Sequence, residues 1–139
     1  MKTAVIMAAG LGTRFGNHTE LHPKGFIEVD GIPMVIRSIE TLLSCGINRI
    51  LIGTGYKSEI FDQLKDKYPQ IENCYSLRYA ETNSMYTLYN MQSLIGDDDF
   101  ILLESDLIYE KRAITALIQH DFQDIMLISP VIKFQDQYY

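Results

Sequence analysis

Short apolar runs alternate with segments of helical periodicity along this chain, and this alternation constrains the fold more than any other feature. Each run has the length of a strand and closes at glycine, acidic or turn-forming residues. The expected strands are Ala4–Ala9, Arg49–Ile52, Ile71–Leu77, Asp98–Leu103 and Ile125–Val131. Because strands that alternate with helices build βαβ units, we predict an α/β domain with a Rossmann-like, doubly wound, mostly parallel sheet and helices on both faces. The third run is the least apolar, which favours a position nearer the sheet edge.

The segments between these runs carry apolar residues at helical spacing. Helices are expected to begin at Pro33, at Ser58, at Asn83 or Ser84, and at Lys111. Gly46 and Pro69 are predicted to end the first two helices, and the last helix is predicted to reach His120. Ser58 is predicted to cap its helix with its side chain. A separate short segment, Phe26–Val29, leads into a predicted Asp30-Gly31 turn.

Length and composition describe an ordinary globular domain. The chain has 139 residues, 47% hydrophobic and 22% charged, which is enough for one core. Its net charge of −6 argues against a nucleic-acid-binding face, which would be basic. No apolar run has the length of a membrane span, and Met1-Lys2 leads directly into the first strand, so neither membrane insertion nor a signal peptide is predicted. Cys45 and Cys74 are interpreted as thiols of a cytoplasmic protein.

The first strand opens into a glycine loop followed by positive charge. Gly10 and Gly12 come directly after the apolar run, then Arg14, and Lys24 follows ten residues later. Ligands of open α/β sheets bind beyond the strand carboxyl ends, where glycines let backbone N–H groups approach an anion. The loop therefore predicts recognition of a polyphosphate. It fits neither a P-loop nor the dinucleotide fingerprint, because Phe15 stands where each pattern, counted from Gly10, requires its later glycine.

Two further stretches carry candidate chemistry. In LLESDLIY, residues 102–109, Asp106 lies just past a buried run and suits Mg²⁺ bound to a triphosphate, although Asp is also a common turn residue. Glu104, two residues earlier, belongs to the same face of that strand, and pairing with a cation is the alternative there to binding the metal. In RYAETNSMYTL, residues 78–88, a loop runs into a helix, and its polar residues are interpreted either as helix caps or as nucleotide contacts.

The combination AAGLGTR followed by PK resembles the signature of the sugar-phosphate nucleotidyltransferases. These enzymes join a nucleoside triphosphate to a phosphorylated acceptor and release pyrophosphate. The stretches PKGFIEVDG, IGTGY, NSM and LLESDLIY look like the cytidylyltransferases that act on small aminoalkyl acceptors. Among these the chain most resembles the enzymes that join CTP to 2-aminoethylphosphonate, with the bacterial-type phosphocholine cytidylyltransferases as near neighbours.

The resemblance implies a nucleotide site along the first strand and its loop. Small residues of the strand would border the base, and the loop would cradle the phosphates. The residues implied are Ala8, Ala9, Gly10, Gly12, Thr13, Arg14 and Lys24. At the loop-to-helix turn, Ala80 and Ser84 would receive the base and ribose.

The resemblance also implies the chemistry. Arg14 would hold the β- and γ-phosphates as pyrophosphate leaves, and Lys24 would bridge the α-phosphate and the attacking phosphonate oxygen. Asp106 would anchor Mg²⁺. No covalent enzyme intermediate is needed, because an anionic acceptor oxygen attacks in line, and catalysis is positioning plus electrostatic stabilisation. Lys133 is a candidate for acceptor binding, against a simpler interpretation as a solvated strand-end charge.

The whole chain, residues 1–139, is expected to form one NTP-binding domain that is truncated at its C-terminus, because members of this family are usually larger. The expected partners are CTP and a small aminoalkyl phosphonate or phosphate, with a homodimer as an open alternative and no nucleic acid or membrane. Other functions remain: a transferase for phosphocholine, another small phosphorylated acceptor or a sugar phosphate, and a non-catalytic nucleotide-binding module. A redox Rossmann domain is disfavoured by Phe15 and by the Pro23-Lys24 pair.

Overall fold

A four-stranded parallel sheet forms the centre of the molecule in the computed structural model, which describes residues 1–10 and 22–130. The strands are β1 (Thr3–Ala8), β4 (Arg49–Thr54), β5 (Ile71–Tyr75) and β6 (Phe100–Glu104), in the order β5-β4-β1-β6. Every neighbouring pair is parallel. β1 is buried along its whole length, since it has strands on both sides and helices on both faces. The least apolar of the predicted strands, Ile71–Leu77, contains β5, which lies at the sheet edge as predicted.

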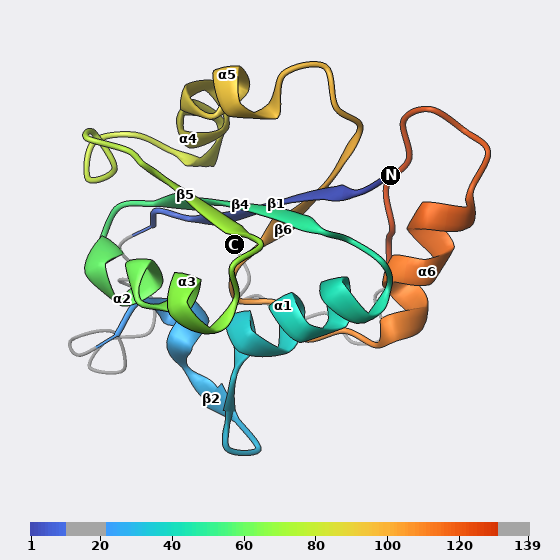
Figure 1. Cartoon of the computed structure of the whole chain (residues 1–139), viewed down its shortest axis with the longest axis horizontal. Helices are drawn as coiled ribbons and strands as arrows, with labels where there is room; N and C mark the ends of the chain where they lie inside the picture. Colours follow the sequence, from blue (N-terminus) through green and yellow to red (C-terminus); the bar gives the residue numbers. More distant parts are fainter. Residues whose placement is uncertain (11–21, 131–139) are drawn as a thin grey trace.

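Helices cover both faces of this sheet (Figure 1). One face carries α1 (Met34–Ser44), α2 (Ser58–Asp62), α3 (Leu64–Lys67) and α6 (Lys111–Gln119), and the other carries α4 (Ser84–Asn90) and α5 (Gln92–Ile95). Successive side chains of a strand point to opposite faces. Ile6 of β1 therefore joins the core beneath α1, whereas Val5 and Met7 join the core beneath α4 and α5. The predicted doubly wound α/β architecture is confirmed.

A small hairpin separates the first strand from α1. The 3-10 turn η2 (Lys24–Phe26) leads into β2 (Glu28–Val29) and β3 (Ile32–Pro33), which pair antiparallel. Asp30 and Gly31 join them with φ of 52° and 78°. Positive φ at both central residues is the geometry of the two-residue hairpin turn, so the Asp30-Gly31 prediction is confirmed. α1 ends at Ser44 with Cys45 as its C-cap, and Gly46, with φ of 90°, comes directly after that cap, as predicted for the end of this helix.

Two sequence predictions were wrong. Ser58 does not cap α2 with its side chain: Lys57 occupies the capping position with φ of 53°, and the Ser58 backbone N–H instead donates to the Gly55 carbonyl at 3.1 Å. The predicted strand Ile125–Val131 is absent over residues 125–130, which have no regular structure. Those residues pair with no strand in the part of the chain that the structure describes, so no ladder of backbone hydrogen bonds stabilises an extended form. Val131 lies outside the described residues.

Candidate functional site

A cleft opens at the carboxyl edge of the sheet, on the face that carries α4. The parallel register places Met7 of β1 opposite Glu104 of β6 and Ala8 opposite Thr54 of β4, so the residues that follow these strands converge. The cleft has a volume of about 180 Å³. Its walls come from the end of β1, from Lys24, from the end of β6 and from the loop that enters α4. The described residues that line it are Met7, Ala9, Gly10, Lys24, Tyr79, Thr82, Asn83, Ser84, Thr87 and Glu104.

Two glycines of β4 and its following loop allow this wall to approach the sheet closely. A Cβ on Gly53 would lie 2.5 Å from Thr87 Cγ2 and 2.8 Å from Met91 Sδ, closer than real Cβ contacts. A Cβ on Gly55 would overlap the Tyr79 side chain and lie 3.0 Å from the Ala9 carbonyl oxygen. The glycines of IGTGY therefore set the position of α4 and of Tyr79 against the cleft.

Lys24 is held at the cleft by the backbone that follows it. Gly25 packs so tightly on Ser105 that an added Cβ would lie 3.0 Å from Ser105 Cβ, and Ser105 in turn donates its backbone N–H to the Met7 carbonyl at 3.1 Å. This contact brings η2 against the end of β6. As a result Lys24 Nζ lies 3.3 Å from Asp106 Oδ2, and the two side chains are only 28% and 21% exposed.

Glu104 adds a second carboxylate to the same side of the cleft. Partial burial raises the pKa of Glu104 above its ordinary value, and the nearby negative charge of Asp106 raises it further. The positive charge of Lys24 and a hydrogen bond with Ser84 oppose that increase in pKa. The ammonium of Lys24 thus lies within the electrostatic influence of two carboxylates at the end of one strand.

The loop that enters α4 is ordered by a side-chain cap. Asn83 Oδ1 accepts a hydrogen bond from the Tyr86 backbone N–H at 3.2 Å, so Asn83 is the cap and Ser84 is the first helical residue. Thr82 Oγ1 donates to the Arg78 carbonyl at 2.6 Å and closes the preceding turn. Asn83 and Ser84 also line the cleft, so a role in starting the helix and a position in the candidate site are compatible.

The predicted site residues fall into three groups. Ala9, Gly10, Lys24 and Ser84 line the cleft together, and Asp106 is paired with Lys24 at its border. Ala8 is buried within β1 and Ala80 is exposed, and neither is among the lining residues. The predictions for Gly12, Thr13, Arg14 and Lys133 lie outside the described residues.

Several lining residues were not singled out from the sequence. Tyr79, Thr82 and Thr87 come from the loop and helix that contact β4. The signal that could have indicated them is the Gly53-Thr54-Gly55 stretch, because glycines directly after a buried strand indicate close approach by another segment. Nothing in the local sequence identifies which segment approaches.

Fold and site together define a Rossmann-like α/β domain with its ligand cleft beyond the strand carboxyl ends, next to a lysine and two carboxylates. Among families of known proteins, the MobA-like NTP transferase domain matches residues 4–135. The chain therefore belongs to the MobA-like NTP transferase family.

Individual relatives narrow the similarity toward cytidylyltransferases. The chain is 35% identical over 105 residues to 2-aminoethylphosphonate cytidylyltransferase of Lancefieldella rimae, a match covering 76% of this chain and 43% of the relative. It is 44% identical over 86 residues to choline-phosphate cytidylyltransferase of Streptococcus pneumoniae, covering 62% and 37%. The chain thus spans less than half the length of these curated relatives.

Solved structures agree with the fold. The CTP:phosphocholine cytidylyltransferase of Streptococcus pneumoniae superposes with a TM-score of 0.69 at 36% identity, covering 76% of this chain and 46% of that one. The inositol-1-phosphate CTP transferase of T. maritima gives a TM-score of 0.75 at 18% identity, covering 88% and 50%, which supports the fold alone. Within the described ranges, no helix is both long and apolar enough to span a membrane.

Proposed function

We propose that this chain carries the nucleotide half of a cytidylyltransferase that condenses CTP with 2-aminoethylphosphonate and releases pyrophosphate. One observation carries the proposal: Lys24 and Asp106 form a half-buried pair, 3.3 Å apart, at the border of the cleft formed by Ala9, Gly10 and the start of α4. A nucleotide in that cleft would bring its phosphates to a cation and its metal to a carboxylate.

The reaction is a displacement at the α-phosphorus of CTP. A phosphonate oxygen of the acceptor forms the new P–O bond, and the bond to the bridging oxygen of the β-phosphate breaks as pyrophosphate leaves. Ala9 and Gly10 would offer backbone groups to the nucleotide, and Ser84 would contact its base or ribose. Arg14, by resemblance, would hold the leaving β- and γ-phosphates.

Among the residues that the structure describes, we propose Lys24 as the cation that acts in catalysis. Negative charge builds on the oxygens around the α-phosphorus as the acceptor attacks, and a fixed ammonium in a partly desolvated site stabilises that charge. The Gly25–Ser105 contact holds the backbone beside Lys24, so little rearrangement is needed to present the side chain. Glu104 and Asp106 together would keep the ammonium at the cleft rather than in solvent.

We propose Mg²⁺ as the cofactor and Asp106 as the residue that holds it. The donor chemistry fits, because Mg²⁺ on a nucleotide takes one or two carboxylates and fills its other positions with water and phosphate oxygens. When bound, the metal would withdraw charge from the α-phosphate. Asp106 would then exchange part of its interaction with Lys24 for the metal.

Two acceptor molecules are candidates for the proposed reaction. The stronger sequence identity, 44%, is to a choline-phosphate cytidylyltransferase, whereas the match with broader coverage is to the 2-aminoethylphosphonate enzyme. Both acceptors are small, carry a cationic nitrogen and present an anionic oxygen on phosphorus. Phosphocholine is therefore the second candidate acceptor.

Cys45 and Cys74 are both free thiols, which supports the proposal that the protein works in the cytoplasm.

Pyrophosphate release tests the proposal. This chain and the complete gene product are each incubated with CTP and Mg²⁺, with 2-aminoethylphosphonate or phosphocholine in parallel, while CTP binding is measured by calorimetry. Release that depends on 2-aminoethylphosphonate supports the proposed reaction, and release by the complete product alone would agree with this chain carrying only the nucleotide half. Release with phosphocholine alone would transfer the assignment to the second acceptor. CTP binding without release by either protein would favour a non-catalytic nucleotide-binding module.

A lysine variant isolates the proposed chemistry. Lys24→Ala is expected to lower turnover by about 10²–10³-fold while CTP affinity changes less, because the cation acts on charge that develops during the reaction. Lys111→Ala is the matched control, since Lys111 Nζ donates to the Ser44 carbonyl at 3.4 Å and Lys111 is not among the described residues that line the cleft. A Lys24 variant that loses CTP affinity but keeps turnover would contradict the assigned role.

A further inference from the structure

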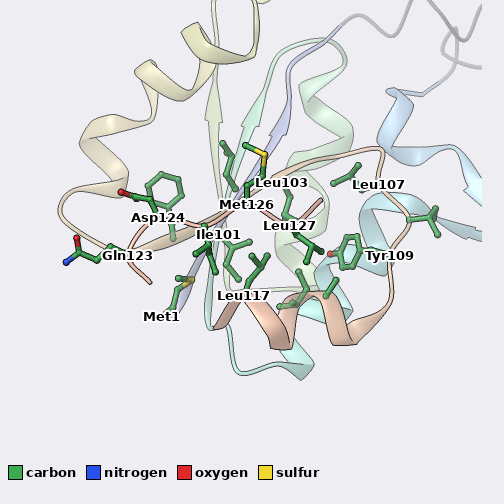
Figure 2. A pocket seen from close by; sticks show the side chains of 16 residues that line it. Met1, Ile101, Leu103, Leu107, Tyr109, Leu117, Gln123, Asp124, Met126 and Leu127 are labelled. Atoms are coloured by element: carbon green, nitrogen blue, oxygen red, sulfur yellow. The ribbon is translucent and has the colours of Figure 1, made fainter. Parts of the chain in front are cut away.

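Glu104 is the one charged residue of β6, and its side chain lies on the face of the sheet that carries α4. Successive side chains of a strand alternate between the two faces. Ile101 and Leu103 point into the apolar cavity beside α6, where Figure 2 shows them with Leu117. Phe100 instead packs in the core beneath α4 and α5. Glu104 follows the alternation of Phe100, so its carboxylate enters the cleft, of which it is a lining residue.

Within the cleft, Glu104 interacts with residues of both walls. Its carboxylate accepts a hydrogen bond from the side chain of Ser84, at the start of α4. It also experiences the positive charge of Lys24, which enters from the turn after β1. Glu104 therefore connects the lysine side of the cleft to the side formed by α4.

The charge of Glu104 limits which part of a nucleotide can lie beside it. An ionised carboxylate only accepts hydrogen bonds, and it repels phosphates. The donors that CTP offers are the ribose hydroxyls and the amino group of the base. Under the proposed function, Ser84 contacts the base or ribose and Lys24 the α-phosphate. The ribose is the part of a nucleotide that joins the base to the α-phosphate, so its hydroxyls are the donors expected at Glu104.

We propose that Glu104 determines sugar specificity: its carboxylate accepts hydrogen bonds from the vicinal hydroxyls of the ribose, so the cleft selects ribonucleotides over deoxyribonucleotides. This inference rests on the proposed binding of CTP in the cleft. A site built to hydrogen-bond a hydroxyl rejects the analogue that lacks it, because a polar group of the protein is then left without its partner. Ser84 is the positioning residue, since its hydrogen bond holds the Glu104 carboxylate in the cleft.

Nucleotide binding tests the proposal without any enzymatic readout. CTP, 2′-deoxy-CTP and 3′-deoxy-CTP are each titrated into the 139-residue chain with Mg²⁺, and their affinities are measured by calorimetry. We expect CTP to bind about tenfold or more tightly than at least one deoxynucleotide, the usual effect of a hydrogen bond to a charged group. In Glu104→Ala this ratio should fall to within about threefold, because CTP loses affinity and the deoxynucleotide does not. Glu104→Gln keeps an acceptor oxygen and should give an intermediate ratio.

The ratio of affinities separates sugar recognition from a general effect of the substitution. Removing Glu104 also frees Lys24, but that change acts on the phosphates, which the three nucleotides share. Glu110→Gln is the matched control: Glu110 also follows β6, its side chain is 73% exposed beside Arg112, and it is not among the described residues that line the cleft. The control should keep the ratio of the unsubstituted chain.

Several results would overturn the proposal. Equal affinity of the unsubstituted chain for CTP and both deoxynucleotides would remove sugar recognition while leaving the proposed binding of CTP intact. The same conclusion would follow if Glu104→Ala kept the full ratio. A variant that changed the preference for CTP over UTP, but not that for CTP over the deoxynucleotides, would show that Glu104 contacts the base instead. Absence of binding by all the nucleotides would contradict the proposed function, and this inference with it.

Discussion

The contact between Gly53 and α4 makes a prediction that can be worked out from distances. In Gly53→Ala, the new methyl would lie 2.5 Å from Thr87 Cγ2 and 2.8 Å from Met91 Sδ. Both neighbours are buried, at 2% and 0% exposure, so α4 must shift to relieve the overlap. Overpacking of this kind costs about 1–3 kcal/mol. For a chain of 139 residues that corresponds to a decrease in Tm of about 3–10 °C, measured by calorimetry alongside urea unfolding.

A second substitution tests whether the clash is the cause. Thr87→Ser removes the methyl that the new side chain would strike and by itself should cost about 1 kcal/mol. Since Met91 is flexible enough to move aside, the double variant Gly53→Ala/Thr87→Ser is expected to be about 1–2 kcal/mol more stable than the sum of the two single effects predicts. Gly10→Ala is the control, because the single contact of its Cβ within residues 1–10 and 22–130 would be Lys24 Cε at 4.0 Å. Strict additivity in the double-mutant cycle would refute the reasoning.

Three further predictions concern the cleft. Asn83→Ala should destabilise the protein by about 0.5–2 kcal/mol in urea unfolding through loss of the cap on the Tyr86 N–H, whereas Asn83→Ser should restore most of it; equal losses would argue against capping. Glu104 has a raised pKa in the folded protein, so its ionisation opposes folding as pH rises from the ordinary carboxyl pKa through the raised one. Glu104→Gln should therefore be the more stable protein near pH 7, and the difference should vanish in acid; a difference independent of pH would contradict this. Asp106→Asn should weaken Mn²⁺ binding in the presence of CTP by about tenfold or more, measured by electron paramagnetic resonance, and unchanged binding would remove Asp106 as the metal-holding residue.

Most of the sheet could be predicted because each buried strand is a short apolar run closed by glycine or acid. β1 and β6 illustrate this: their positions in the sequence and their shared carboxyl edge followed from the pattern alone, so Lys24 and Asp106 were expected in one place. The hairpin turn at Asp30-Gly31 was equally predictable, since its geometry depends on two adjacent residues.

The features that the sequence did not predict depend on contacts between segments that are not adjacent in the sequence. Ser58 is a residue type that often caps helices with its side chain. Here its backbone N–H instead donates to the Gly55 carbonyl in the turn from Gly55 through Lys57, and α2 begins without a side-chain cap. Residues 125–130 have the composition of a strand, yet a strand needs a hydrogen-bonded partner, and no strand of the described structure pairs with them. Tyr79 enters the cleft because Gly55 leaves room for it, and no local pattern joins those two positions.

The central claim is that the cleft at the carboxyl edge of the sheet binds CTP, and a titration followed by ¹H–¹⁵N NMR tests it most directly. With CTP added in the presence of Mg²⁺, we expect saturable shifts concentrated at Ala9, Gly10, Gly25 and Ser84, with the amides of α6 unchanged. Lys24→Ala should leave most of these shifts in place. Saturable shifts confined to other surfaces, or no saturable binding at millimolar CTP, would contradict the account.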